Sequence, residues 1–475
     1  MGCAVCKLAQ FKDGVECFDM AIALAPTNAE YFCARASALA EINRHAEAIA
    51  DYEVAIALKQ NYAQAYTYRG NAMRALGRVD AAIESFDQAI ALQADSPDAF
   101  LNRGNALQQK SLFELALASY DQAIALQPHY PMAYSNRSAA LKHMHRLQES
   151  LASSDQAIAQ DPGYIDAQWN KALTLLLAGD LAQGFRGYLV RWQTDVFQPV
   201  RRHFKPPLWL GVESIKGKRL FVHNEQGLGD SLQFCRFVTL AAQAGARVIY
   251  EVESPLFDLM KTLEGVDVLL RQRDTLPPFD YYCPVMSLPV ALGTTLDSLP
   301  AKVPYLHADV GKRTKWAQRL RPRQGLRVGL VWSGSATHKA DHQRSISLVE
   351  LMQALPLQLS YVSLQKELRD ADQSALAHWP LIQHFGEEIE DFSDTAALCE
   401  LMDIVIAVDT SVAHLAGALG VNTWVLLPHF PDWRWLLERR DSPWYPTMQL
   451  FRQHAAGHWA PVLRAVHDQL LKMPG

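Results

Sequence analysis

The first third of the sequence repeats itself every 34 residues. The string Ala-Ile-Ala starts once in each unit, at residues 21, 55, 89, 123 and 157. An aromatic row keeps the same step until serine replaces it: Phe18, Tyr52, Phe86, Tyr120 and then Ser154. A basic row keeps it as well: Arg35, Arg69, Arg103, Arg137 and Lys171. A unit of this size buries its apolar face only by stacking on the next unit, so the chain is predicted to begin as one curved rod.

Each unit carries the pattern of two helices. In one unit, a first helix over residues 65–76 meets a turn at Gly77, and a second helix runs to Leu92. The second helix stops before a proline in three units, at Pro26, Pro128 and Pro162. Helix pairs with a 34-residue period are typical of tetratricopeptide repeats. The sequence therefore predicts an α solenoid over residues 1–195, ending in a capping helix at residues 179–192.

Two features of the repeat array are left open by the sequence. Projecting the period backward places Met1 in the middle of a first helix, so the chain is expected to begin inside a repeat that is either truncated or a shortened cap. The basic row that starts at Arg35 also has two interpretations. It could line the concave face and hold a ligand peptide, or it could be solvated and form ion pairs within the repeats.

The composition argues against several classes of protein. The net charge is −5 and no basic block stands out, so a nucleic-acid partner is not expected. No stretch reaches the roughly 18 uninterrupted apolar residues of a membrane helix. The seven cysteines are scattered, and the pair Cys3-x-x-Cys6 has no second pair to complete a metal site. We therefore expect a cytoplasmic protein without an integral membrane segment.

Prolines at positions 199, 206 and 207 mark the end of the repeats. Beyond them, short β-branched runs alternate with helical stretches, which is typical of a parallel sheet covered by helices. The candidate strands are 219–223, 247–252, 266–270, 281–285, 326–332, 360–364, 404–408 and 423–427. A cluster of prolines and charges at residues 302–325 divides this region. We expect two Rossmann-like lobes, at residues 196–310 and 311–475, with ligands at the carboxyl ends of the strands.

The first candidate site is a glycine-rich turn directly after the first strand, with the sequence His223-Asn-Glu225-Gln-Gly227-Leu-Gly229-Asp230. Gly227 and Gly229 permit a tight turn and a close approach of the backbone. The carboxylate of Asp230 is expected to face the cleft between the lobes, where it could accept a proton from an acceptor hydroxyl. It could equally cap the helix that it opens. No third glycine follows, so the turn is not a full dinucleotide fingerprint.

The second candidate site follows the first strand of the second lobe. Its sequence is Trp332-Ser333-Gly334-Ser335-Ala-Thr337-His338-Lys339, ending in Arg344-Ser345. Ser333 and Gly334 are expected to leave backbone N–H groups open, while Lys339 and Arg344 supply positive charge. This combination suits a diphosphate, although a charged surface loop has the same composition.

The third candidate site follows a strand that ends at residue 408, with the sequence Asp409-Thr410-Ser411-Val-Ala-His414-Leu-Ala-Gly417-Ala-Leu-Gly420. Thr410 or Ser411 is expected to cap the next helix, whose first-turn amides form an anion site. His414 lies one turn further on and could donate to a phosphate, or it could be a buried structural histidine. The sequence predicts that all three sites converge on one cleft.

Two further motifs have simpler explanations. Asp370-Ala-Asp372 has the spacing of a metal-binding pair of carboxylates, but it lies in a polar helical run, so no metal is expected there. The segment Pro431-Asp-Trp433-Arg-Trp435 is aromatic and basic, which packing of the segment explains, although either tryptophan could stack on a base or a sugar.

These motifs together resemble a known family. The segment Asp409-Thr410-Ser411-x-x-His414-x-Ala416-x-Ala418-Leu419-Gly420 looks like the D-[ST]-x-x-x-H-x-A-x-A-L-G element of the heptosyltransferase-like glycosyltransferases, which have the two-lobed GT-B fold. The turn from Glu225 to Asp230 resembles the glycine-rich acidic turn of their first lobe. The whole chain is similar to bacterial tetratricopeptide proteins of that superfamily.

The resemblance implies an inverting, metal-independent, hexosyl- or heptosyltransferase-like enzyme that uses a nucleotide-diphospho-sugar and no further cofactor. By matching position, Asp230 would be the general base, and Asp409 would anchor the turn between strand and helix. Diphosphate binding would fall to Lys339, which would neutralise the departing group, and to Thr410, Ser411 and His414. The shorter first lobe and an unrelated loop around His338 depart from the family pattern.

The sequence thus leads to a principal hypothesis and two alternatives. In the first, the repeats recruit a protein or peptide acceptor for a glycosyltransferase. In the second, the repeats are a non-catalytic scaffold joined to a degenerate transferase module. In the third, a sugar is transferred to a lipid or glycan at a membrane surface, which the lack of a basic amphipathic face argues against.

Overall fold

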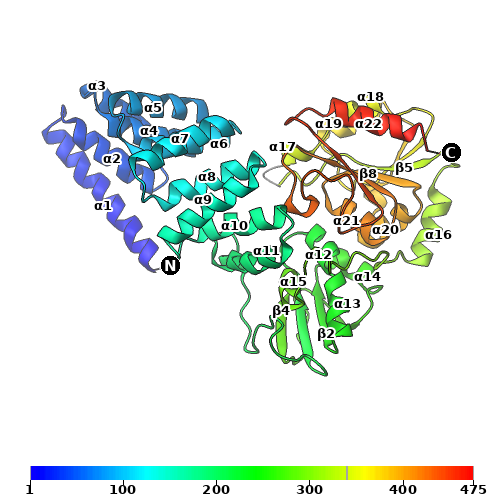
Figure 1. Cartoon of the computed structure of the whole chain (residues 1–475). Coiled ribbons are helices and arrows are strands. Elements are labelled where there is room, and N and C mark those ends of the chain that lie inside the picture. The colour runs from blue at the N-terminus through cyan, green and yellow to red at the C-terminus, as the bar shows by residue number, and fades with distance from the viewer. Residues whose placement is uncertain (1, 338–340, 474–475) are drawn as a thin grey trace. The chain divides into compact units, whose positions relative to one another are not determined.

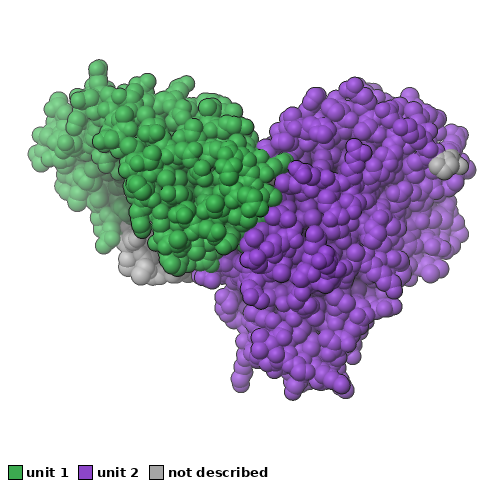
Figure 2. All heavy atoms as spheres, in the orientation of Figure 1, with its two compact units in different colours: residues 1–174 green, residues 175–475 purple. Residues whose placement is uncertain are grey.

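The computed structural model describes residues 2–337 and 341–473 of the chain. These residues divide into two compact units, residues 1–174 and residues 175–475 (Figure 2). The segment predicted to cap the repeats, residues 179–192, belongs to the second unit. Each unit is described below by itself.

The first unit consists of helices that pack in antiparallel pairs (Figure 1). They are α1 (Gly2–Leu24), α2 (Ala29–Glu41), α3 (His45–Leu58), α4 (Ala63–Ala75), α5 (Val79–Leu92), α6 (Pro97–Gln109), α7 (Phe113–Leu126), α8 (Pro131–His143) and α9 (Leu147–Gln160), and α10 (Ile165–Leu177) follows. The turn within each pair contains one residue in the left-handed region, again at 34-residue spacing: Asn43, Gly77, Ser111 and His145. The predicted α solenoid of tetratricopeptide type is confirmed.

The aromatic row packs against a row of small residues sixteen positions earlier. A Cβ atom added to Gly70 would lie 2.6 Å from the ring of Phe86, and one added to Gly104 would lie 2.5 Å from Tyr120. Serine replaces the aromatic residue at Ser154, and serine also replaces the glycine sixteen positions earlier, at Ser138. The two hydroxyls are hydrogen-bonded at 2.6 Å. The two rows therefore change together, because each fills the space that the other leaves.

Four of the five cations in the basic row form ion pairs within the repeats. They pair with a row of aspartates sixteen positions earlier: Asp19 with Arg35, Asp87 with Arg103, Asp121 with Arg137 and Asp155 with Lys171. Arg35 also pairs with Asp51 at 2.7 Å, and Arg69 donates to the Ser85 hydroxyl at 3.1 Å. Of the two interpretations of this row, the structure supports ion pairs within the repeats.

The second unit contains two parallel sheets covered by helices (Figure 1). The first sheet comprises β1 (Arg219–His223), β2 (Arg247–Val252), β3 (Val266–Arg271) and β4 (Tyr281–Pro284), in the order β3-β2-β1-β4. The second comprises β5 (Arg327–Val331), β6 (Ser360–Ser363), β7 (Ile382–His384), β8 (Ile404–Val408), β9 (Thr423–Leu427) and β10 (Met448–Arg452), in the order β10-β9-β8-β5-β6-β7. The predicted α/β class is confirmed, and the sequence missed only the two edge strands β7 and β10.

The helices of the second unit begin with α11 (Leu181–Tyr188) and a short 3-10 helix η1 (Leu189–Gln193). The longer helices that follow are α12 (Leu228–Phe234), α13 (Arg236–Gln243), α16 (Val310–Arg319), α18 (Leu348–Ala354), α19 (Asp370–Leu376), α20 (Phe392–Glu400), α21 (Ser411–Ala418) and α22 (Ala460–Leu470). Three of them, α18, α19 and α22, pack on the apolar face formed by alternate residues of β5, β8 and β9. Among the helices described, none has both the length and the apolar character needed to cross a bilayer.

The strand order fixes where a ligand would bind. In each sheet the first strand in sequence, β1 or β5, lies between its second and fourth strands. The connections therefore leave in opposite directions on the two sides of this strand, and a crevice opens at its carboxyl end. The loops that follow β1, β5 and β8 are the three candidate sites of the sequence.

Replacing Gly104 with alanine tests the packing of the two rows. Alanine favours a helix by up to about 1 kcal/mol, but here the methyl group would collide with the Tyr120 ring, so we expect a net destabilisation of about 1–3 kcal/mol. Hydrogen exchange of α6 and α7 should accelerate. Gly14→Ala is the matched control, because a Cβ there meets nothing within 4 Å, and it should slow exchange in α1. Slower exchange in both variants would contradict this packing.

Candidate functional site

The glycine-rich turn after β1 brings Asp230 to the start of α12. The helix begins at Leu228, so Asp230 is its third residue and does not open it as expected. Its Oδ2 accepts the Gly227 N–H at 2.9 Å, and its Oδ1 is contacted by Nη2 of Arg434. Burial raises the pKa of Asp230, while Arg434 and the Gly227 N–H oppose that shift. Asp230 therefore bonds back to the cap residue Gly227 from the third helical position, and its carboxylate also forms an ion pair.

Glu225 holds the loop in place through other partners than those of Asp230. Both of its oxygens accept from the guanidinium of Arg191 in η1, at 2.7 and 2.9 Å, and the Met286 N–H donates to it at 3.2 Å. Arg191 is fully buried and donates in addition to the Ser287 hydroxyl at 2.7 Å. Because a buried ion pair is stable only when both partners are present, this pair fixes the position of the turn.

The loop after β8 presents the N-terminus of α21. Thr410 occupies the cap position with an extended backbone, and its side chain does not cap the helix. Its Oγ1 is buried and has no hydrogen-bond partner in the structure. The first amides of a helix also have no intrahelical acceptor, and the helix dipole makes this end positive. A buried hydroxyl donor beside free amides is an arrangement that an anion would satisfy.

The first and third candidate sites meet directly. Helix α12 packs on α21, and a Cβ added to Gly229 would lie 3.2 Å from the His414 ring and 3.4 Å from the Cα of Ser411. The absence of a side chain at residue 229 therefore permits this approach. Asp230 and the Thr410–His414 turn consequently lie at one junction between the two sheets.

His414 is a buried neutral imidazole. Its ring stacks on Trp435 at a centroid distance of 5.2 Å, and its Nδ1 is hydrogen-bonded to the Tyr445 hydroxyl at 3.0 Å. Burial holds the pKa of His414 well below its ordinary value, and the charges of Arg434, Arg236 and Arg344 add to the effect. The residue contributes a hydrogen bond and a ring face to this junction, without a charge.

The loop after β5 differs from the expectation. The Ser333 N–H donates to Oε1 of Gln365 at 3.2 Å, and the Gly334 N–H donates to the Ser345 hydroxyl at 3.1 Å. These amides are therefore not open to a ligand, because neighbouring side chains already accept from them. Lys339, together with His338, lies outside the described residues.

Arg344 links the second and third candidate sites. Its Nη1 donates to the carbonyl of Asp409 at 2.7 Å, and its Nε pairs with Asp341 at 3.2 Å. Asp341 also pairs with Arg369. The positive charge of Arg344, which was expected to bind a diphosphate, is thus largely compensated by the Asp341 carboxylate. Contacts thus join the second candidate site to the third, and the third to the first, with Arg344 bonded to the base of the β8 loop.

A second carboxylate faces Asp409. Burial and then the like charge of Asp432 raise the pKa of Asp409 to about 6, while Arg344 and Arg434 oppose the shift. The junction therefore gathers three carboxylates, at residues 230, 409 and 432, around two arginines. Such a set of charges is stable only because each arginine contacts more than one acceptor.

Sequence reasoning identified Arg344 but missed two other arginines of this junction, Arg434 and Arg236. Arg434 lies in the aromatic segment 431–435, which had been explained by packing. Arg236, in the apolar run of α13, is buried and donates to the carbonyl oxygens of Pro300 and Trp444 and to the Tyr305 hydroxyl. The position of Arg236 within an apolar helical run could have indicated a buried, hydrogen-bonded arginine, because an arginine is buried only when it has partners.

No cluster of three metal-ligating side chains occurs in the part of the chain that the structure describes. Within the Asp370-Ala-Asp372 motif, Asp372 is buried and its Oδ1 accepts the Leu348 N–H at 3.4 Å. That carboxylate therefore connects α19 to the start of α18 and serves packing.

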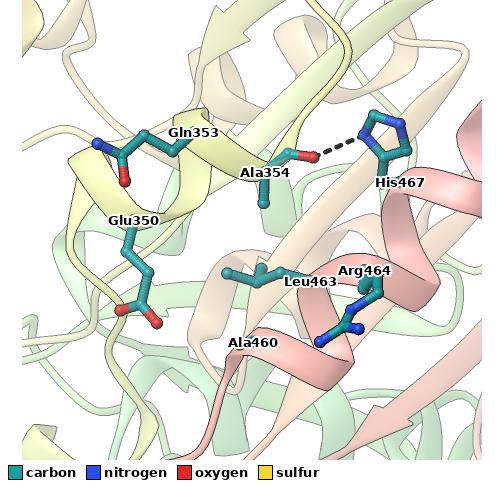
Figure 3. A pocket seen from close by; sticks show the side chains of 7 residues that line it. All are labelled: Glu350, Gln353, Ala354, Ala460, Leu463, Arg464 and His467. Atoms are coloured by element: carbon teal, nitrogen blue, oxygen red, sulfur yellow. Dashed lines mark hydrogen bonds between the residues drawn. The ribbon is translucent and has the colours of Figure 1, made fainter.

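A pocket of about 410 Å³ lies elsewhere, between α18 and α22 (Figure 3). Its lining residues are Glu350, Gln353, Ala354, Ala460, Leu463, Arg464 and His467. The only hydrogen bond drawn there joins His467 Nδ1 to the Ala354 carbonyl at 2.7 Å. The pocket shares no residue with the junction of the two sheets, and we regard it as a groove left by helix packing.

The raised pKa of Asp409 predicts a pH-dependent stability. An aspartate in the unfolded chain has a pKa of about 3.9, so the folded protein binds more protons between about pH 4 and pH 6, and stability falls as the pH rises through this window. Asp409→Asn should therefore stabilise the second unit above pH 6, by at most about 3 kcal/mol, and leave it unchanged below pH 4. Urea unfolding followed by tryptophan fluorescence measures this, because every tryptophan except Trp169 lies in that unit.

The control for this experiment is Asp441→Asn. The hydrogen bond from Arg439 lowers the pKa of Asp441, so its carboxylate stabilises the fold at neutral pH, and the effect of this variant should have the opposite sign. A pH-independent difference for Asp409→Asn would show that its carboxylate is ionised like an exposed one.

Comparisons with known proteins bear on the first unit and, through one relative, on 64% of the chain. Tetratricopeptide-repeat family models match residues 1–65 and 97–130, and a TPR repeat model matches residues 70–111. Protein FlbA of Caulobacter vibrioides is 25% identical over 331 residues, which cover 64% of this chain and 54% of that protein. The chain thus spans about half the length of this curated relative.

Similar solved structures are repeat proteins. YrrB, described as a TPR protein with an unusual peptide-binding site, is 24% identical with a TM-score of 0.33, covering 39% of this chain and 94% of that one. PilW, described as a type IV pilus biogenesis factor, is 17% identical with a TM-score of 0.37, covering 40% and 90%. MamA is 21% identical with a TM-score of 0.31, covering 32% and 90%. The matched family models and the helix pairs together show that the first unit is built of tetratricopeptide repeats, which are protein-interaction modules.

Proposed function

We propose that the second unit is an inverting glycosyltransferase with two lobes of GT-B type, and that the repeats recruit a protein or peptide acceptor to it. The observation that carries the proposal is the meeting of a carboxylate, Asp230, with the N-terminus of α21, where Thr410 has a buried hydroxyl without a partner. Sugar transfer needs a base and a binding site for a departing diphosphate within one cleft.

The donor would place its diphosphate at the N-terminus of α21. The amides of its first turn and the Thr410 hydroxyl would donate to the phosphate oxygens, and the positive end of the helix dipole would stabilise their charge. Arg344 stands beside this turn through its bond to the Asp409 carbonyl. Lys339 is proposed, by its position in the sequence, to add a second cation.

The transfer step would proceed by a single displacement. The acceptor hydroxyl oxygen forms a bond to the anomeric carbon while the bond from that carbon to the diphosphate oxygen breaks. The bonding electrons leave with the nucleoside diphosphate, and the hydroxyl proton passes to Asp230. Because the diphosphate charge is met by helix amides and side-chain cations, the proposal assigns no step to a metal.

One observation favours a second candidate function. Asp230 is already engaged by the Gly227 N–H and by Arg434, as a purely structural carboxylate would be. The second candidate is therefore a non-catalytic scaffold, in which the lobes are a folded platform and the repeats assemble partners.

Incubation of the full chain with ADP-, UDP- and GDP-sugars distinguishes the two functions. A transferase should release nucleoside diphosphate from at least one donor, and Asp230→Asn should lower this turnover by about 10²- to 10⁴-fold while the melting temperature stays close to that of the wild type. Asp441→Asn, on an exposed ion pair with Arg439, is the matched control and should retain full turnover. Silence with every donor, or equal turnover of Asp230→Asn and wild type, would refute the catalytic assignment and leave the scaffold.

A further inference from the structure

Arg434 is held at the junction of the two sheets by three side chains. Its Nε donates to Oε1 of Gln233 at 2.8 Å, its Nη1 donates to Asp432 at 2.8 Å, and its Nη2 contacts Asp230. The guanidinium also lies over the Trp433 ring, 4.2 Å from its centroid. Only 9% of the Arg434 side chain is exposed, so its charge acts in a poorly hydrated environment.

Two of these contacts keep the guanidinium in place without Asp230. Gln233 and Asp432 bind separate nitrogens, and the Asp432 carboxylate also accepts the backbone N–H of Arg434 at 2.9 Å. A guanidinium carries five N–H groups, of which these three side-chain contacts use three. The arginine can therefore exchange its partner at Nη2 while its own position is maintained.

The same charge reaches the proposed anion site. Burial depresses the pKa of His414, in the first turns of α21, and the charge of Arg434 is the next largest cause. Arg434 is also one of the charges that act on Asp409, the residue before Thr410. An anion at the N-terminus of α21 would thus lie in the field of the guanidinium that now neutralises Asp230.

We propose that Arg434 is a donor-binding residue that exchanges Asp230 for the donor diphosphate, so that the base becomes free only when the donor is bound. This inference rests on the proposed transferase function and adds to it an order of events within the site. Burial raises the pKa of Asp230 and Arg434 opposes that shift, so the paired carboxylate is a weaker base than the same buried carboxylate would be without the arginine. A diphosphate carries more charge than a carboxylate and offers arginine several acceptors, so it competes for the Nη2 group.

The exchange predicts opposite effects from the two partners of one ion pair. Removing the Asp230 charge frees Arg434 for the ligand, so Asp230→Asn should bind nucleoside diphosphate about tenfold more tightly than the wild type. Arg434→Gln should bind about tenfold more weakly. The double variant should bind like Arg434→Gln alone, because the gain from Asp230→Asn requires the arginine.

Isothermal titration of the full chain with ADP, UDP and GDP measures these affinities, and thermal unfolding of each variant verifies its fold. Arg439→Gln is the matched control, since Arg439 pairs with Asp441 and takes no part in the site, and its affinity should equal that of the wild type. Arg434→Lys keeps the charge and should recover part of the affinity. If Arg434→Gln fails to fold, the nucleotide affinity of Asp230→Asn compared with that of the wild type still tests whether the exchange occurs.

The outcomes separate this inference from the function on which it rests. If the wild type binds a nucleoside diphosphate and Asp230→Asn binds it equally or more weakly, the exchange is refuted while the donor site stands. An affinity gain that persists in the double variant also refutes it, because the gain would not come through Arg434. If the wild type binds none of the three nucleotides, the donor site and the exchange are both refuted.

Discussion

The second unit depends on the close contact between α12 and α21, one helix from each parallel sheet. A glycine makes this contact, because any side chain at residue 229 would meet the His414 ring and the Ser411 backbone. The contact places the loop after β1 against the loop after β8. Everything that the site could do follows from this, since a carboxylate from one sheet and a helix N-terminus from the other share one junction.

Three arginines, two of them buried, hold that junction together. Arg191 fixes the turn after β1 through Glu225, Arg344 fixes the turn after β8 through a carbonyl, and Arg434 joins the two sheets through Asp230. Each donates to more than one acceptor, which offsets the cost of removing a charge from water. The same arrangement leaves the Thr410 hydroxyl without a partner. A ligand-binding surface is expected to leave polar groups unsatisfied in this way.

In the repeats, ion pairs and close packing hold neighbouring helices together. Four of their five cations lie sixteen residues from aspartates on the neighbouring helix, so most of the charge row is compensated inside the array. Their aromatic and small residues are matched at the same spacing, and both rows change to serine together. The rows recur at the 34-residue step of the sequence, but the structure was needed to show which rows contact each other and that the basic row forms ion pairs.

The sequence by itself determined the repeat period, the helix pairs, all eight predicted strands to within one residue at each end, and the three loops of the candidate site. These features depend on short-range patterns of apolar residues, glycines and prolines, which are legible along the chain. Tertiary structure alone decided which polar groups in those loops are free. The amides of Ser333 and Gly334 are occupied by Gln365 and Ser345, and Asp230 is bound by an arginine 204 residues away. Hydrogen bonds and ion pairs of this kind join groups that only the folded chain brings together, so no local pattern records them.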